Sequence, residues 1–354
     1  MTAPLRILFG TSVLARGHGV SLVIKELVQR LRVLLPKAEI AIAALRIGEE
    51  ERTSMHEVGI TVLPCTADLA EHRVSAWRPD VFLPHTDPFF GMVPKSARIV
   101  VHEHGDPSPA LFALDRDERD RQRHRKQVDV YHNADVVLAI SEFQRQDLPW
   151  PSSQLLYNGC NHVPDLGAKS LSDLARTDPP SFRLGVLSRL DGGEALYKGF
   201  EILQILAPRL KEKILGLELE YCGKISPAMI SVLEAEGWRV RSGVTDQQRN
   251  DWLRSCHLIL SPSLWEGFNL PLVEAQALGS MAVAFDTGAH PEVVPFVCGG
   301  IDEMEGLIVA LDQNRELLCQ YSQDAYKFVR DRFNWDHAAE ALAQLILKLT
   351  SRRR

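Results

Sequence analysis

Short apolar runs alternate along the chain with segments of helical periodicity. The runs in the first half are continuous, as in strands that are buried on both faces of a parallel sheet. They are Leu5–Phe9, Ile40–Leu45, Ile60–Leu63, Val81–Leu83, Ile99–Val101 and Val136–Ile140. Between Val20 and Leu34 the apolar residues recur every three or four positions, which predicts a helix. This alternation predicts an α/β domain with a doubly wound sheet.

The same rhythm restarts in the second half of the chain. Strands are predicted at Arg183–Leu187, Leu217–Cys222, Val240, Leu258–Leu260 and Met281–Phe285, and helices at Gly199–Lys211 and Pro271–Leu278. The segment Asp165–Ser181 has few apolar residues and a double proline near its end, which is typical of a linker. We therefore expect one domain over residues 1–165, a linker over 166–181 and a second domain over 182–333.

Composition narrows the class of protein. Apolar residues make up 45% of the 354 and charged residues 24%, and the formal net charge of -6 gives no reason to expect nucleic-acid binding. The six cysteines are scattered singly, as buried thiols of a reduced protein would be. No apolar run reaches 18 residues and the N-terminus lacks a signal peptide pattern, so we expect a cytoplasmic protein.

The most charged segment is Asp115–Lys126, with six basic and four acidic residues. A solvated helix face with local ion pairs is the simpler interpretation. A basic patch facing an anionic lipid surface or a phosphorylated acceptor is the alternative, and it leaves open a peripheral contact with the inner face of the membrane.

Candidate chemistry concentrates between Leu258 and Gly279. A buried strand is expected to end near Ser261, a loop to follow, and a helix to begin near Pro271, because proline suits the first helical turn. The N-terminus of such a helix is a natural anion site. Glu266 in the loop and Glu274 in the helix would accept hydrogen bonds from the hydroxyl groups of a sugar and a ribose. Gly267 would let a ligand approach the backbone closely.

Further candidates lie at other predicted strand ends. Arg189 and Lys198 follow the first strand of the second half and would neutralise a diphosphate. Gly17 and Gly19 follow the first strand of the chain, in GHGVSL, a near miss to the dinucleotide pattern G-x-G-x-x-G that disfavours a Rossmann dehydrogenase.

Three histidines also follow predicted strands. His85 follows VFLP, and His102 and His104 follow IVV. The carboxyl ends of strands are where open α/β sheets bind ligands, so these residues are candidates for a site.

SPSLWEGFNLPLVEAQALG resembles the E-x7-E motif of the retaining glycosyltransferases with the GT-B fold that are numbered family four, also called group 1. The common form of the motif has glycine where this chain has Asn269. The resemblance is fair at Arg189 and at Phe333–Ala338, and weak in the first half. The Asp191–Tyr197 loop lengthens the spacing between Arg189 and Lys198 by about three residues relative to the family.

The resemblance implies two Rossmann-like domains, with a C-terminal helix over residues 334–354 that crosses back to the first domain. It implies a hexosyltransferase that moves sugar from a nucleoside diphosphate sugar to a sugar, glycan or lipid-linked acceptor with retention, as in polysaccharide biosynthesis. It assigns catalysis to Glu266, His104, Arg189 and Lys198. Donor contacts fall to residues of two loops and one helix: Gly17, Gly19, Gly267, Phe268, Asn269, Leu270 and Glu274. No cofactor and no essential metal are expected.

Two other functions stay open. A sugar-nucleotide epimerase could use a related two-domain fold and would convert the donor without an acceptor. A catalytically silent sugar-nucleotide-binding subunit is the second, because Asn269 and the longer loop before Lys198 depart from the family pattern.

Overall fold

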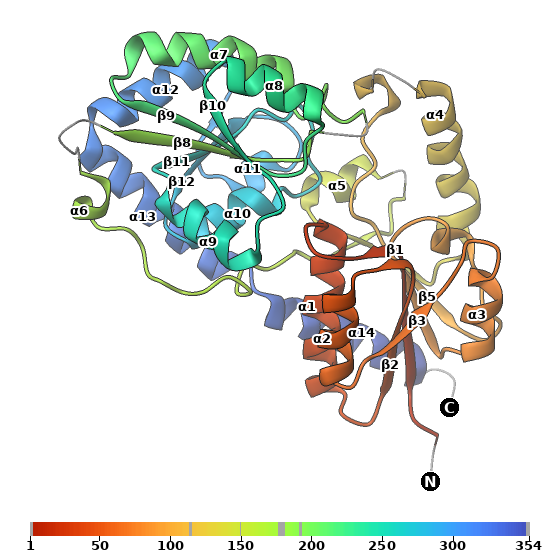
Figure 1. Cartoon of the computed structure of the whole chain (residues 1–354). Coiled ribbons are helices and arrows are strands. Elements are labelled where there is room, and N and C mark those ends of the chain that lie inside the picture. Colours follow the sequence, from red (N-terminus) through yellow and green to blue (C-terminus); the bar gives the residue numbers. More distant parts are fainter. Residues whose placement is uncertain (1–2, 113–114, 149, 176–180, 191–192, 352–354) are drawn as a thin grey trace. The chain divides into compact units, whose positions relative to one another are not determined.

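The computed structural model describes residues 3–112, 115–148, 150–175, 181–190 and 193–351. The chain divides into two compact units. Unit 1 comprises Met1–Asp106, Glu118–Gly159 and Asn334–Arg354, and unit 2 comprises Pro107–Asp117 and Cys160–Phe333. Each unit is a parallel sheet with helices, as the sequence predicted (Figure 1).

Unit 1 contains a seven-stranded parallel sheet in the order β3-β2-β1-β4-β5-β6-β7. Its strands are β1 (Arg6–Leu14), β2 (Glu39–Ile47), β3 (Thr61–Pro64), β4 (Val81–Pro84), β5 (Arg98–His102), β6 (Val136–Ala139) and β7 (Gln154–Leu155). Its helices are α1 (Gly19–Leu34), α2 (Glu49–Glu57), α3 (Ala70–Trp77), α5 (Glu142–Asp147) and α14 (Trp335–Ser351). Helix α4 (Arg116–Arg125) begins in the unit 2 segment and continues into unit 1.

Helix α14 belongs to unit 1 although it is the last helix of the chain. It packs beside α1 (Figure 1). Arg30 of α1 donates from Nε to Oδ1 of Asp336 at 2.6 Å. Trp335, the first residue of α14, is 1% exposed.

Unit 2 contains a six-stranded parallel sheet in the order β10-β9-β8-β11-β12-β13. Its strands are β8 (Phe182–Leu187), β9 (Leu217–Cys222), β10 (Trp238–Arg241), β11 (Leu258–Ser261), β12 (Met281–Phe285) and β13 (Val297–Cys298). Its helices are α6 (Leu171–Leu174), α7 (Phe200–Lys213), α8 (Pro227–Ala235), α9 (Asp246–Ser255), α10 (Leu270–Ala277), α11 (His290–Val293), α12 (Ile301–Gln313) and α13 (Arg315–Arg332). The core gathers apolar side chains from the sheet and from α7, α12 and α13.

Both sheets reverse their strand order beside their first strand. The reversal falls between β1 and β4 in unit 1 and between β8 and β11 in unit 2. Loops that follow the two strands flanking such a reversal diverge to opposite faces of the sheet and leave a crevice at its carboxyl edge. The loops that flank the reversal are therefore those after β1 and β4 in unit 1 and those after β8 and β11 in unit 2.

Some local expectations need amendment. The sequence missed β7 and β13, because two residues are too few to show a periodicity. Part of the predicted linker, residues 176–180, lies outside the described residues, but Lys169 within it is 4% exposed and donates to Ser280 Oγ at 2.9 Å. All six cysteines are buried and free, as predicted. No helix in the described ranges is long and apolar enough to cross a membrane.

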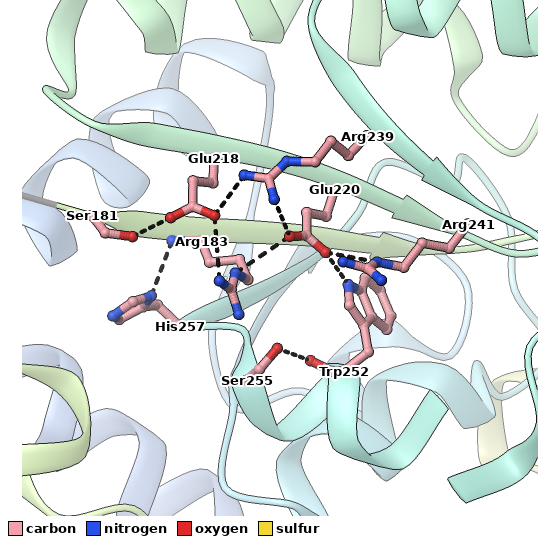
Figure 2. A network of polar contacts seen from close by, with 9 residues as sticks. All are labelled: Ser181, Arg183, Glu218, Glu220, Arg239, Arg241, Trp252, Ser255 and His257. Atoms are coloured by element: carbon pink, nitrogen blue, oxygen red, sulfur yellow. Dashed lines mark hydrogen bonds and ion pairs between the residues drawn. The ribbon is translucent and has the colours of Figure 1, made fainter. Parts of the chain in front are cut away.

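A buried carboxylate organises one part of the unit 2 sheet (Figure 2). Glu220 of β9 is fully buried and accepts hydrogen bonds from Trp252 Nε1 at 2.7 Å and Arg241 Nε at 3.1 Å. Arg183 and Arg239 lie within ion-pair distance of its other oxygen, at 3.4 and 3.7 Å. Because a buried charge is costly unless it is paired, this set of partners holds β8, β9, β10 and α9 in register.

Replacing Gly199 by alanine is expected to destabilise unit 2. Gly199 has a φ of +75°, and a Cβ there would lie 2.1 Å from the carbonyl oxygen of Pro262. The strained backbone alone costs about 1–3 kcal/mol. The free energy of unfolding in urea should fall by at least that amount. Gly306→Ala, inside α12 with nothing near the added Cβ, is the control and should stabilise by about 0.5–1 kcal/mol. Equal stability of the two variants would contradict the account.

Unit 2 is expected to lose stability in mild acid through His257. Its Nδ1 accepts from the backbone N–H of Arg183 at 3.0 Å (Figure 2), and burial, aided by nearby cations, lowers its pKa from 6.5 to about 3. The unfolded chain therefore binds a proton below pH 6.5 that the folded chain does not, so stability falls as the pH drops through that value.

Titration of His257 lowers the free energy of unfolding by at most about 1.4 kcal/mol per pH unit. Denaturant unfolding at a series of pH values measures it. His257→Asn keeps an acceptor near the position of Nδ1 without a titrating ring, and should show a shallower loss. An unchanged slope in His257→Asn would remove His257 as the cause.

Candidate functional site

The candidate site of unit 2 lies where the strand order reverses. Residues 188–199 follow β8, and Pro262–Asn269 follow β11, the neighbouring strand. Lys198 and Glu266 are 68 positions apart in sequence, yet Lys198 Nζ donates to Glu266 Oε1 at 2.8 Å. The two side chains are 15% and 13% exposed. The topology thus brings together two of the residues that the sequence singled out.

The loop that carries Glu266 is fixed by backbone contacts on two sides. The backbone N–H of Leu264 donates to the carbonyl of Tyr197 at 2.6 Å, and that of Ala289 donates to the carbonyl of Glu266 at 2.9 Å. Gly288, in a turn with a φ of +58°, lies so close to this loop that a Cβ on it would be 2.6 Å from the backbone carbonyl oxygen of Glu266. The backbone of the loop that carries Glu266 is therefore held by the segments around Tyr197 and Ala289.

Glu266 is held as a carboxylate. Burial alone would raise its pKa, but the Lys198 ammonium, the nearby His290 and the hydrogen bonds from Lys198 and Ser263 outweigh it, so the net shift of the Glu266 pKa is downward. A carboxylate is an acceptor-only group with two oxygens. One oxygen is bound to Lys198, and the group can accept hydroxyl donors while it stays ionised at neutral pH.

Glu274, one turn into α10, is 3% exposed and has different partners. Its Oε1 lies 2.8 Å from His162 Nε2 and 3.7 Å from Arg249. Burial acts to raise the pKa of Glu274, and Arg249 together with the His162 hydrogen bond lowers it further than burial raises it. The sequence analysis did not single out His162 or Arg249. They follow neither a motif nor the carboxyl end of a strand, so no local pattern marks them.

Arg189 differs from its predicted setting. Its Nε and its terminal nitrogen donate to the two oxygens of Glu194 at 2.5 and 2.6 Å, and the side chain is 42% exposed. Sequence reasoning missed Glu194 as a partner, since it lies in the extended loop between Arg189 and Lys198. Residues 191–192 of that loop lie outside the described residues. An anion that binds Arg189 through these nitrogens would compete with Glu194 for their N–H groups.

The side chain of Asn269 lies elsewhere than the sequence predicted. Its φ of +66° is the left-handed conformation that favours glycine, which is the family's residue at this position. The Asn269 amide is buried and donates to Ser261 Oγ and His290 Nε2, both at 2.9 Å. The side chain is therefore anchored within unit 2 by two hydrogen bonds, whereas the sequence analysis had expected it beside a donor sugar.

The other predicted donor residues of unit 2 surround the start of α10. Leu270 is the first residue of the helix and Pro271 the second, which confirms the predicted helix start. The Phe268 ring is 2% exposed and meets the Phe333 ring edge-on at 5.1 Å between centroids. Gly267 lies in the loop just before it. The side chain of Phe268 is thus part of the core of unit 2.

The unit 1 candidates lie at the carboxyl edge of the other sheet. Gly17, with a φ of +78° and open space around a built Cβ, lies in the loop after β1, and Gly19 is the first residue of α1. His85 directly follows β4 and His102 ends β5, so the expected strand-end placement is confirmed. His85 Nδ1 lies 2.7 Å from His104 Nε2.

The charged segment at residues 115–126 forms α4 followed by Lys126. None of the α4 side chains is buried, and Arg121 and Gln122 bond to Glu118 within the helix. Lys126 differs, since its side chain is 14% exposed and lies 3.5 Å from Glu103. The local pairs agree with the simpler interpretation of a solvated helix face.

Comparison with known proteins identifies the class. Residues 182–320 match the family model described as glycosyl transferases group 1. Unit 2 therefore carries a domain of the group 1 glycosyltransferase family, as the sequence resemblance implied.

Relatives of known name match parts of the chain. The lipopolysaccharide core biosynthesis mannosyltransferase LpsB of Rhizobium meliloti is 43% identical over 68 residues, 19% of this chain and 18% of LpsB. A D-inositol 3-phosphate glycosyltransferase of Xylanimonas cellulosilytica is 28% identical over 182 residues, 46% of this chain and 42% of that one. The matched region thus spans less than half of each relative's length.

Structural likeness extends over nearly the whole chain. Anabaena Alr3699/HepE, solved in complex with UDP and glucose, superposes with a TM-score of 0.77 at 18% identity, over 97% of this chain and all of HepE. This likeness shows that the chain has the GT-B fold.

The anchored Asn269 generates a paired prediction. Asn269→Gly and Asn269→Ala both remove the two amide hydrogen bonds, so both should unfold at lower urea concentration than wild type. Only alanine also pays the left-handed backbone cost, so it should be less stable than the glycine variant by about 1–2 kcal/mol. Equal stability of the two variants would show that the backbone at position 269 is not strained.

Proposed function

We propose that the protein is a retaining glycosyltransferase that moves a hexose-type sugar from a nucleoside diphosphate sugar to a hydroxyl acceptor. The observation that carries the proposal is the Lys198–Glu266 pair at the order reversal of a group 1 glycosyltransferase domain. Crevices at such reversals bind ligands in open α/β sheets, and dinucleotides are among the ligands bound there.

In this proposal the diphosphate lies near Lys198 and the N-terminus of α10. A cation and a helix N-terminus both favour negative charge, and the charge that develops on the leaving diphosphate is what needs stabilising during transfer. Arg189 would join them after exchanging Glu194 for a phosphate. Gly267, in the loop before the helix, and Leu270, its first residue, would contribute backbone N–H groups.

The two glutamates are proposed to orient the donor through its hydroxyl groups. Glu266, ionised and bonded to Lys198 through one oxygen, would hold hydroxyls of the transferred sugar. Glu274 would hold the ribose, with His162 and Arg249 keeping its carboxylate charged and oriented. Orientation of this kind lowers the entropic cost of reaching the transition state.

The roles of Gly17, Gly19 and His104 rest on the family resemblance alone. So do retention by same-face attack, with the leaving phosphate oxygen taking the acceptor proton, and the independence from metal ions. The acceptor is proposed to be a sugar, a glycan or a lipid-linked molecule. Two relatives support an acceptor hydroxyl group on a molecule of one of these kinds. They are LpsB, named for lipopolysaccharide core biosynthesis, and the D-inositol 3-phosphate glycosyltransferase.

The donor can be identified by thermal unfolding in the presence of UDP, GDP and ADP and of their glucose and mannose conjugates. A ligand that binds only the folded state raises the midpoint, by an amount that grows with its concentration over Kd. UDP-glucose is included among these ligands because HepE was solved in complex with it. We expect one nucleotide series to stand out. If no nucleotide shifts the midpoint, the proposal is wrong.

Glu266→Gln and Arg189→Ala are each expected to reduce the rate of sugar transfer by at least about 100-fold while the fold is retained. The rate is measured from the release of the nucleoside diphosphate. Glu212→Gln, on the exposed side of α7, is the matched control and should keep wild-type activity. Full activity of either site variant would contradict the assignment. Conversion of the donor sugar without any acceptor would instead favour the epimerase.

A further inference from the structure

Three histidine side chains of unit 1 form a histidine cluster at the carboxyl ends of two adjacent strands. β4 and β5 pair in parallel. His85 is the first residue after β4, His102 is the last residue of β5, and His104 lies two positions further on. The ring centroids of the three side chains are 4.6 to 5.0 Å apart. Neighbouring strands that end at one edge of the sheet therefore bring the three rings together.

The backbone and the ring of His85 are both fixed by the sheet. The backbone N–H of His85 donates to the carbonyl oxygen of Gly10 at 2.8 Å, directly after the paired residues of β1 and β4. The His85 ring is 1% exposed and lies 5.5 Å from the Phe9 ring, centroid to centroid. His104 follows the end of β5 in a loop and is only partly buried. Of these two histidines, His85 is therefore the one that can hold the other in place.

The contact between His85 and His104 has the geometry of a hydrogen bond between two rings. His85 Nδ1 lies 2.7 Å from His104 Nε2. The two ring planes are inclined by only 21°, and the ring centroids are 5.0 Å apart. Because the centroids are much further apart than the two nitrogens, the rings meet edge to edge and do not stack face to face. An N–H in the plane of one ring thus points at the lone pair in the plane of the other.

His102 is not an alternative partner for His104. Within the described parts of the chain, both nitrogens of His102 make no hydrogen bond, although its ring is 4.6 Å from the His104 ring. Burial lowers the pKa of all three histidines below the ordinary 6.5, to about 3 for His102, so the rings are neutral at neutral pH. In a hydrogen bond between two neutral rings, one ring donates and the other accepts.

The second nitrogen of His85 indicates which ring donates. His85 Nε2 is buried and has no hydrogen-bond partner among the described residues. If His104 donated, His85 would carry its own proton on Nε2, as a buried N–H without an acceptor, and such groups are rare. If His85 donates from Nδ1, its Nε2 is only an unused acceptor. His104 then accepts at Nε2 and carries its proton on Nδ1.

We propose that His85 is a positioning residue for sugar transfer, which fixes the ring orientation and the tautomer of His104 through the hydrogen bond from Nδ1 to Nε2. The inference rests on the proposed function, in which His104 acts at the donor sugar. In the tautomer that His85 selects, Nδ1 of His104 has an N–H that can donate to an oxygen of that sugar. The other tautomer would have a lone pair there. A donor that is oriented in advance needs no reorganisation during the reaction.

Two substitutions at position 85 separate this role from packing. His85→Leu removes the hydrogen bond, whereas His85→Asn keeps an amide N–H close to the place of Nδ1. In the full chain, with the donor that the nucleotide panel selects, His85→Leu should lower kcat by about 10- to 100-fold, because a small misplacement of an acting group has effects of that size. His85→Asn should restore most of the lost kcat.

Two controls accompany the rates. The Kd of the nucleoside diphosphate should be the same in wild type and His85→Leu, because His85 has no proposed contact with the nucleotide. His56→Gln, on the exposed face of α2, removes a histidine elsewhere in unit 1 and should keep the wild-type kcat. Wild-type kcat in folded His85→Leu would overturn the proposal. Equal losses in folded His85→Leu and His85→Asn would attribute the effect to packing and overturn it too.

The tautomer of His104 is measured directly by NMR, from the nitrogen chemical shifts of the imidazole rings, without donor or acceptor. His104→Gln identifies the His104 signals. Wild type should carry the proton on Nδ1 of His104, and His85→Leu should lose this preference. A proton on Nε2 of His104 in wild type would overturn the proposal even if His85→Leu does not fold. A wild type that transfers no sugar would instead overturn the proposed function, and the spectrum would still decide the tautomer.

Discussion

The shared carboxyl edge of neighbouring parallel strands is the constraint on which both candidate sites depend. In unit 2 it places the loop after β8 next to the loop after β11, so that Lys198 reaches Glu266 across 68 residues of sequence. In unit 1 the neighbouring strands β4 and β5 deliver three histidines to the same edge. Parallel strands end together, so residues that follow them meet whatever their separation in the chain.

The charged residues of the unit 2 candidate site are paired. Lys198 bonds to Glu266, Arg189 to Glu194, and Glu274 to His162 with Arg249 nearby. The partners of Glu266 and Glu274 lower the pKa of these two carboxyl groups and so keep them ionised, and a diphosphate would compete with Glu194 for Arg189. The proposed donor site is therefore organised before any ligand arrives.

The sequence predicted much of this arrangement. Apolar runs predicted the strands of both sheets apart from the two-residue β7 and β13, with β10 marked by Val240 alone. The positions of proline and glycine predicted the start and end of α10. The resemblance to group 1 glycosyltransferases and the GT-B fold are confirmed over residues 182–320 and in the overall fold. The domain boundaries and the roles of the site residues stay predictions.

Partners across strands were beyond the reach of the sequence. Nothing local ties His162 to Glu274 or Asn269 to His290, because those pairs depend on the packing of α10 against its neighbours. Asn269 shows the limit most clearly. Its departure from glycine was visible, but the direction of its side chain follows from a φ of +66° and two buried acceptors. The histidine cluster was likewise visible as strand ends, but not as a set of converging nitrogens.

The central claim is that a nucleoside diphosphate sugar binds beside the Lys198–Glu266 pair. The most direct test is a crystal structure of the protein with the donor that the nucleotide panel selects. The account predicts the diphosphate within hydrogen-bond distance of Lys198 and a hydroxyl of the sugar on Glu266. A donor bound elsewhere, with the pair between Lys198 and Glu266 untouched by the ligand, would contradict it.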